Sequence, residues 1–73
     1  MQLSSLTPGD VARVRSISAE APVALRLREM GLRPGVRLRL AGNAASGARV
    51  VSIGAARIAV DRATCARIEV EPA

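Results

Sequence analysis

Short stretches in which apolar and polar residues alternate make up much of this chain, with glycine or proline between them. In residues 36–40 (VRLRL), Val36, Leu38 and Leu40 alternate with two arginines. This pattern predicts a half-buried strand with its aliphatic residues inside and its arginines outside. Residues 49–53 and 56–60 flank Gly54-Ala55, and this arrangement is typical of a β-hairpin.

Two further strands are expected at the ends of the chain. In Val11–Ile17, the apolar Val14 and Ile17 do not fall on the same face, so we expect a β-bulge between them. Near the C-terminus, Asp61 is placed to cap a short helical turn ending near Ala66. The last strand follows, with Ile68 and Val70 inside. Leu3 and Leu6 are spaced to cover one end of the core, ahead of a turn at residues 7–10.

A short helix is predicted from about Pro22, which suits a first turn, to Met30. At 100° per residue, Val23, Leu27 and Met30 share one stripe, which we assign to the core. Leu27 and Met30 could instead line a cleft beneath the helix. Leu25 falls almost opposite this stripe.

The helix has a clear stop signal in Gly31, which can adopt the left-handed conformation of a C-cap. Leu32 would then fold back onto the helix, and Pro34-Gly35 would form a turn into the next strand. We therefore predict structural roles for Leu27, Met30, Gly31, Leu32, Pro34 and Gly35.

Five short strands joined by turns predict a mainly β fold, a small closed or nearly closed barrel. One short α-helix follows the first strand, and a helical turn precedes the last one. Residues 1–73 are expected to form a single domain, with residues 41–48 as a loop. No apolar run reaches the ~20 residues that span a bilayer, and the N-terminus lacks a signal-peptide pattern, so the cytoplasm is the expected compartment.

The composition excludes most catalytic and metal chemistry. The chain has no histidine and one cysteine, so neither a Ser-His-Asp nor a Cys-His group can form. The six carboxylates show no paired spacing, and no glycine pattern fits a nucleotide loop. We therefore predict no catalytic residues, no cofactor and no metal ligands within one chain, although a metal shared between subunits stays open. Cys65 is expected to be a small packed residue.

The net charge is +5, and all eleven basic residues are arginines. A basic domain suits nucleic acid, an acidic protein surface or an anionic membrane face. The chain has no aromatic residue on which bases could stack. We therefore expect nucleic-acid binding to be weak, salt-sensitive and without sequence preference.

Two segments resemble the FeoA family of bacterial ferrous iron uptake. The residues are Met30, Gly31, Leu32, Pro34 and Gly35, following Leu27 on the short helix, and IAVDRATCARIEVE at 58–71. The resemblance implies an SH3-like five-stranded barrel. It also implies an accessory or regulatory partner of the FeoB permease, a membrane protein with a cytoplasmic GTPase domain. Such a protein acts by protein–protein contact and is neither an enzyme nor a carrier of iron.

The predicted partner-binding face is the outer side of the helix, formed by Leu25, Arg26, Arg28 and Glu29. An apolar residue within a polar rim is how small interfaces tend to be built. The loop at residues 44–48 departs from the family pattern, so no function is carried over to it. An interaction module of another system stays open, such as an orphan copy of the C-terminal domain of DtxR-type repressors, or a weak RNA-binding barrel. The oligomeric state is also open.

Overall fold

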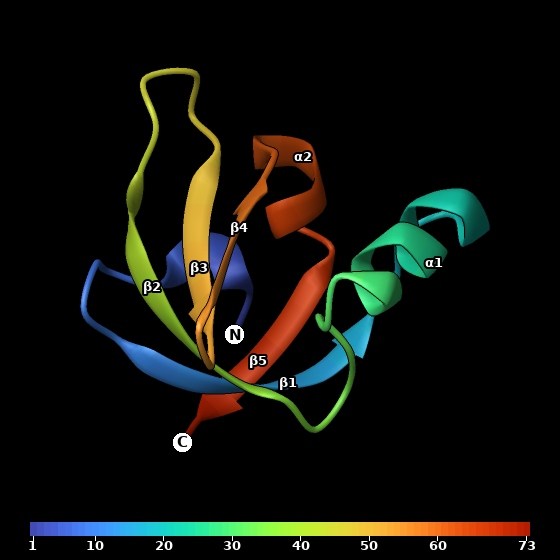
Figure 1. Ribbon diagram of the computed structural model, residues 1–73, viewed down its shortest axis with the longest axis horizontal. Helices are drawn as coiled ribbons and strands as arrows, with labels where there is room; N and C mark the ends of the chain where they lie inside the picture. The colour runs from blue at the N-terminus through green and yellow to red at the C-terminus, as the bar shows by residue number, and fades with distance from the viewer.

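The computed structural model describes residues 1–73 and has the predicted order of elements (Figure 1). The chain forms five strands, one α-helix, one helical turn and a short 3₁₀ turn. In chain order these are η1 (Leu3–Ser5), β1 (Val11–Ile17), α1 (Ala21–Glu29), β2 (Arg37–Asn43), β3 (Arg49–Ile53), β4 (Ala56–Val60), α2 (Arg62–Cys65) and β5 (Ile68–Pro72). The fold is mainly β, as the alternating pattern predicted. No helix is both long and apolar enough to cross a membrane.

All strand pairs are antiparallel, and the sheet order is β4-β3-β2-β1-β5. The sheet bends around the core, but β4 and β5 do not pair, so the barrel, which was expected to be closed or nearly closed, is open. Residues before η1 cover the outer edge of β5, where Gln2 bridges Glu69 and the amide of Val70 donates to the carbonyl of Met1 at 2.7 Å. No strand covers the outer edge of β4.

Two bulges bend the central strands. The bulge predicted in β1 lies between Val14 and Ser16, where the register with β5 shifts. A second register shift, between Leu40 and Gly42, was not predicted. It lets β2 continue to Asn43, so part of the expected loop is strand, and residues 44–48 make the connection to β3.

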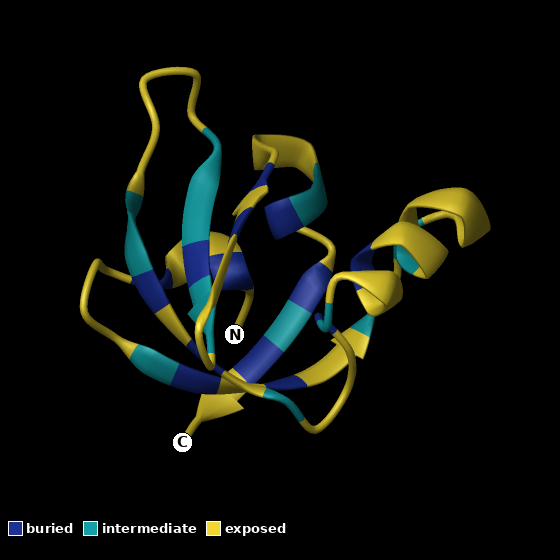
Figure 2. Cartoon of the chain, in the orientation of Figure 1, coloured by how far each residue is buried: buried dark blue, intermediate teal, exposed yellow.

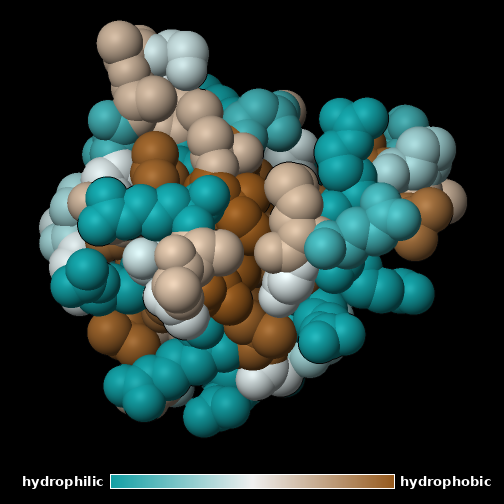
Figure 3. All heavy atoms as spheres, in the orientation of Figure 1, coloured by the Kyte–Doolittle hydropathy of each residue, from teal (hydrophilic) through white to brown (hydrophobic).

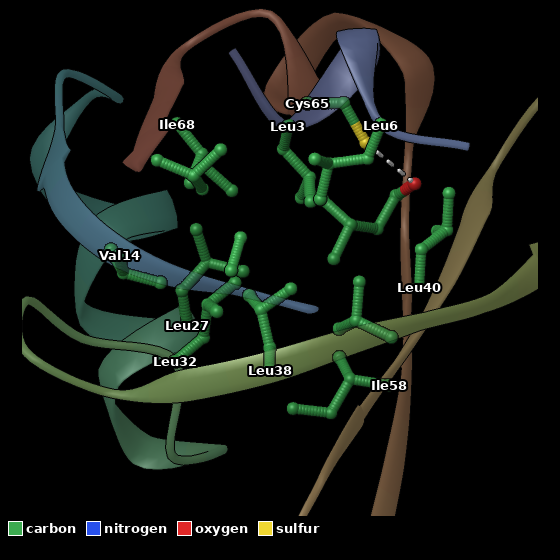
Figure 4. Close-up of a cluster of buried hydrophobic side chains, with 14 residues drawn as sticks. Leu3, Leu6, Val14, Leu27, Leu32, Leu38, Leu40, Ile58, Cys65 and Ile68 are labelled. Atoms are coloured by element: carbon green, nitrogen blue, oxygen red, sulfur yellow. Dashed lines mark hydrogen bonds between the residues drawn. The ribbon is translucent and has the colours of Figure 1, made fainter. Parts of the chain in front are cut away.

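The core is a single aliphatic cluster (Figure 4). The inward positions of the strands alternate as predicted, and Leu3 and Leu6 close one end. Its fourteen buried residues are Leu3, Leu6, Ala12, Val14, Leu27, Leu32, Leu38, Leu40, Val51, Ile58, Val60, Cys65, Ile68 and Val70. Arg49 of β3 is hydrogen-bonded to the segment around η1. Its Nη1 donates to the carbonyls of Leu3 at 2.9 Å and Leu6 at 2.6 Å.

The predicted hairpin and helical turn are present. β3 and β4 flank Gly54-Ala55, and Ile53 faces Ala56 across the turn. Asp61 occupies the N-cap position of α2, but its side chain makes no capping hydrogen bond to the backbone. The turn at residues 7–10 is closed by the amide of Asp10, which donates to the carbonyl of Thr7 at 2.9 Å.

Candidate partner-binding site

Helix α1 ends in a left-handed glycine cap, as its sequence predicted. Met30 is the C-cap residue, and Gly31 follows with φ of +95°. The amide of Gly31 donates to the carbonyl of Arg28 at 3.0 Å, and the amide of Leu32 donates to that of Leu27 at 2.9 Å. These two bonds form a Schellman motif. The motif turns the chain so that Leu32, which is fully buried, enters the core beside Leu27.

The turn after the cap joins the helix to the sheet. The amide of Val36 donates to the carbonyl of Arg33 at 3.1 Å, across Pro34-Gly35. Gly35 has φ of +91°, a left-handed conformation that glycine adopts without the steric cost of a Cβ atom. The amide of Gly35 then donates to the carbonyl of Val14 at 2.8 Å, which fixes the turn against β1.

The assignment of the whole helical stripe to the core was wrong. Only Leu27 is buried, whereas Val23 is 36% exposed and Met30 is 39% exposed. The reason is that α1 stands at the side of the bent sheet and no sheet face lies against its whole length (Figure 1). Most of the helix is exposed, as Figure 2 shows. Periodicity correctly placed the three residues on one side, but it does not show how much of that side is covered.

A groove separates this side of α1 from β4 and α2, and Leu27 and Met30 both line it, so the cleft that was expected as an alternative is present beneath the helix. Hydrophobic side chains fill the centre of this view of the surface, between the β3–β4 hairpin and α1 (Figure 3). The groove is lined by Val23, Arg26, Leu27 and Met30 of α1, together with Ala59, Val60, Asp61 and Thr64. No sequence pattern singled out Ala59 or Thr64, because whether they line a groove depends on which strand lies at the sheet edge.

The predicted partner-binding residues are all exposed, but they do not form one compact cluster. Leu25 is 53% exposed, and Glu29 lies one helical turn further along the same side. Arg26 borders the groove toward β4. Arg28 borders a different hollow, toward Arg33 and Pro34. The structure therefore divides the four residues between two sides of the helix.

Cys65 is buried and makes one weak polar contact. Its Sγ donates to the carbonyl of Val60 at 3.5 Å. Burial raises the pKa of the Cys65 thiol, and the nearby charge of Arg49 opposes this only in part. Asp61 is exposed, and the hydroxyl of Thr64 beside it lowers the pKa of its carboxyl. No three His, Cys, Asp or Glu side chains lie close enough together to hold a metal ion.

Comparisons with known proteins identify a family and several solved structures with the same fold. The model of the FeoA domain family matches residues 1–72. The solution structure of FeoA from Chlorobium tepidum is 33% identical, with a TM-score of 0.92 over 99% of this chain and 70% of that chain. The solution structure of iron(II) transport protein A from Clostridium thermocellum is 32% identical, with a TM-score of 0.89 over 99% of this chain and 45% of that chain.

A third solved structure has a description that bears on function. It is the zinc complex of FeoA from Stenotrophomonas maltophilia, described as a prokaryotic SH3 domain protein and a candidate activating factor of bacterial ferrous iron transport. It is 30% identical, with a TM-score of 0.80 over 97% of this chain and 89% of that chain. No curated protein sequence matches the chain.

Proposed function

Because the chain belongs to the FeoA domain family, we propose that it is a cytoplasmic accessory protein of bacterial ferrous iron uptake that acts by binding the FeoB-type permease. The family and the relatives described as iron transport proteins support the link to ferrous iron. The proposed contact with the permease is supported by the exposed surface of α1.

One observation carries the proposal: the exposed large hydrophobic residues are concentrated on one helix. The protein has four of them, and Val23, Leu25 and Met30 lie on α1 and its cap. The fourth, Met1, is at the N-terminus. Clusters of exposed apolar residues rimmed by charge mark protein-interaction sites. Arg26 and Arg28 place charge on either side of Leu25, toward two different hollows, and Glu29 lies one helical turn beyond it.

The site has the chemistry of a binding surface. Its apolar residues would lose contact with water on association, and its arginines would pair with carboxylates of the partner. It offers no nucleophile with an adjacent base, because the only thiol is buried and the chain has no histidine. We therefore assign it a role in contact and regulation rather than in catalysis or in carrying iron.

Calorimetric titration of the full chain with the permease's cytoplasmic domain tests the proposal. The double variant Leu25→Ser with Arg28→Glu should bind at least ~5-fold more weakly, as for an interface residue worth ~1 kcal/mol or more. Its melting temperature should stay near that of the parent, because neither side chain is buried. Arg57→Glu is the matched control, since it reverses one exposed arginine on β4 and should bind like the parent.

A second double variant, Val23→Ser with Met30→Ser, separates the groove from the outer side of the helix. Weaker binding of this variant alone would place the partner in the groove. Weaker binding of the Leu25 variant alone would place it on the outer side. If both variants fold and bind like the parent, α1 is not the partner-binding surface and the proposal is refuted.

A further inference from the structure

Four arginines gather on the outer face of the sheet, away from α1. They are Arg13 on β1, Arg37 and Arg39 on β2, and Arg57 on β4, and they are called here the arginine face. All four side chains are exposed, because the alternate positions of these strands point into the core.

Strand register brings these arginines together in a way that costs folding free energy. Arg13 lies directly opposite Arg37 in the β1–β2 pair. Arg39 lies opposite Ser52, and Ser52 lies opposite Arg57. Directly opposite residues in antiparallel strands have Cα atoms about 4.5–5.5 Å apart, and like charges there are destabilising. A bound anion would offset this repulsion.

The arginine face has little internal neutralisation. Arg13 Nη1 donates to the carbonyl of Gly35 at 3.2 Å, but Arg37, Arg39 and Arg57 make no side-chain hydrogen bond or ion pair. The nearest carboxylate along the register is that of Glu71, opposite Arg13 on β5. That carboxylate lies 4.0 Å from the guanidinium of Arg15.

We propose that the arginine face binds peripherally to an anionic lipid surface, with lipid phosphates placed among its guanidinium groups. A shallow hollow between Arg37 and Arg39, with Ser52 and Gly54 at its side, gives a phosphate room to approach. Guanidinium groups pair with phosphate through charge-assisted hydrogen bonds. Lipids can move sideways to meet each arginine, so an irregular spacing of charges is no obstacle.

Two other partners fit this face less well. A protein interface is usually anchored by large apolar or aromatic residues, and none of the exposed large hydrophobics lies on the arginine face. Single-stranded nucleic acid is held partly by aromatic stacking, and the chain has no aromatic residue.

The surface differs from the proposed partner-binding helix, and the inference does not depend on the identity of the permease. It also requires no insertion into the bilayer. Each basic residue near an anionic membrane contributes about a fivefold gain in binding, so a few arginines give reversible, salt-sensitive attachment.

Co-sedimentation of the full chain with vesicles tests the proposal. Phosphatidylglycerol mixed equally with phosphatidylcholine should bind the protein at low ionic strength and release it in high salt, whereas phosphatidylcholine alone should not bind it. The triple variant Arg37→Gln, Arg39→Gln, Arg57→Gln should partition about 100-fold more weakly. Lysine at the same three positions should retain most of the binding.

The matched control is Arg33→Gln, Arg62→Gln, Arg67→Gln, which removes the same charge from exposed arginines elsewhere. It should bind vesicles much more tightly than the arginine-face variant. Equal losses in the two variants would show that net charge alone drives binding and would overturn the proposal. Undiminished binding of the arginine-face variant would overturn it as well.

Two further measurements keep the test decisive. Tighter binding to single-stranded RNA or duplex DNA than to the anionic vesicles, at the same ionic strength, would refute the lipid assignment. If the triple variant fails to melt cooperatively, Arg37→Glu decides the question. That change puts a carboxylate opposite Arg13, so its melting temperature should be at least that of the parent. Its vesicle binding should fall about 30-fold, and unchanged binding would overturn the proposal.

Discussion

Replacing Gly31 by valine isolates the contribution of the helix cap to the fold. Gly31 has φ of +95°. This conformation is unfavourable for any residue with a Cβ atom and is a severe outlier for a β-branched residue. A Cβ built at this position has no other atom within 4 Å. The substitution therefore adds backbone strain without a steric clash.

The size of the effect follows from the strain and from the smallness of the domain. A non-glycine residue held in such a region costs about 1–3 kcal/mol. A chain of this length is stable by about 4–11 kcal/mol. With each kcal/mol worth about 4–8 °C in a small domain, a loss of about 2 kcal/mol lowers the melting temperature by about 8–16 °C.

Unfolding is best followed by far-UV circular dichroism, because the chain has no tryptophan or tyrosine to report it. Gly42→Val is the matched control, since Gly42 also has open space at its Cβ position but does not have positive φ. It should melt within a few degrees of the parent. Gly31→Asn should fall between the parent and Gly31→Val, because asparagine tolerates positive φ better than valine.

Two results would refute this reasoning. Equal melting of Gly31→Val and Gly42→Val would show that the cap contributes nothing to stability. Loss of helical signal with no change in the main transition would show that strain at Gly31 frays α1 without reaching the core. The second result would contradict the coupling expected through Leu32, which is fully buried directly after the cap.

Two other predictions concern the metal and the thiol. Anaerobic calorimetry with ferrous iron should show no one-to-one site at micromolar protein, because no cluster of His, Cys, Asp or Glu is present; a stoichiometric isotherm from the monomer would contradict this. Burial raises the pKa of the Cys65 thiol above its ordinary value of 9.0, so the folded protein holds this proton more tightly than the unfolded chain does. The resulting contribution to folding stability is complete below pH 9.0 and is lost as the pH rises above that value. Chemical denaturation across this alkaline range should show a decline that Cys65→Ala reduces, and an identical decline in both proteins would disprove it.

The sequence predicted the strands well where apolar and polar residues alternate strictly. Leu38 and Leu40 pointed inward as expected, and the odd spacing of Val14 and Ile17 correctly indicated a bulge. The continuation of β2 to Asn43 was missed, because Ala41-Gly42 carries no alternation to mark a strand. Backbone pairing with β3 extends the strand there, and such pairing is not encoded locally.

The candidate site was predicted less well, because a groove depends on relations between elements. Helical periodicity grouped Val23 with Met30, but whether any surface covers them depends on how far the sheet wraps around. The order β4-β3-β2-β1-β5 brings β4 opposite α1, and this order cannot be predicted from any single segment of the sequence. The cap at Gly31 was easier to predict, since local residues determine it.

The uncovered edge of β4 has a consequence for how copies of this chain behave at high concentration. Ile53 and Ala56 close a two-residue hairpin, so the pairs alternate in hydrogen bonding and the amides of Arg57 and Ala59 face away from β3. Free strand edges of this kind recruit other strands and start aggregation, and proteins protect them by keeping them short and charged. β4 has only five residues, with the exposed Arg57 among them. Repulsion between Arg57 of one molecule and Arg57 of another would oppose edge-to-edge pairing at this open side of the sheet.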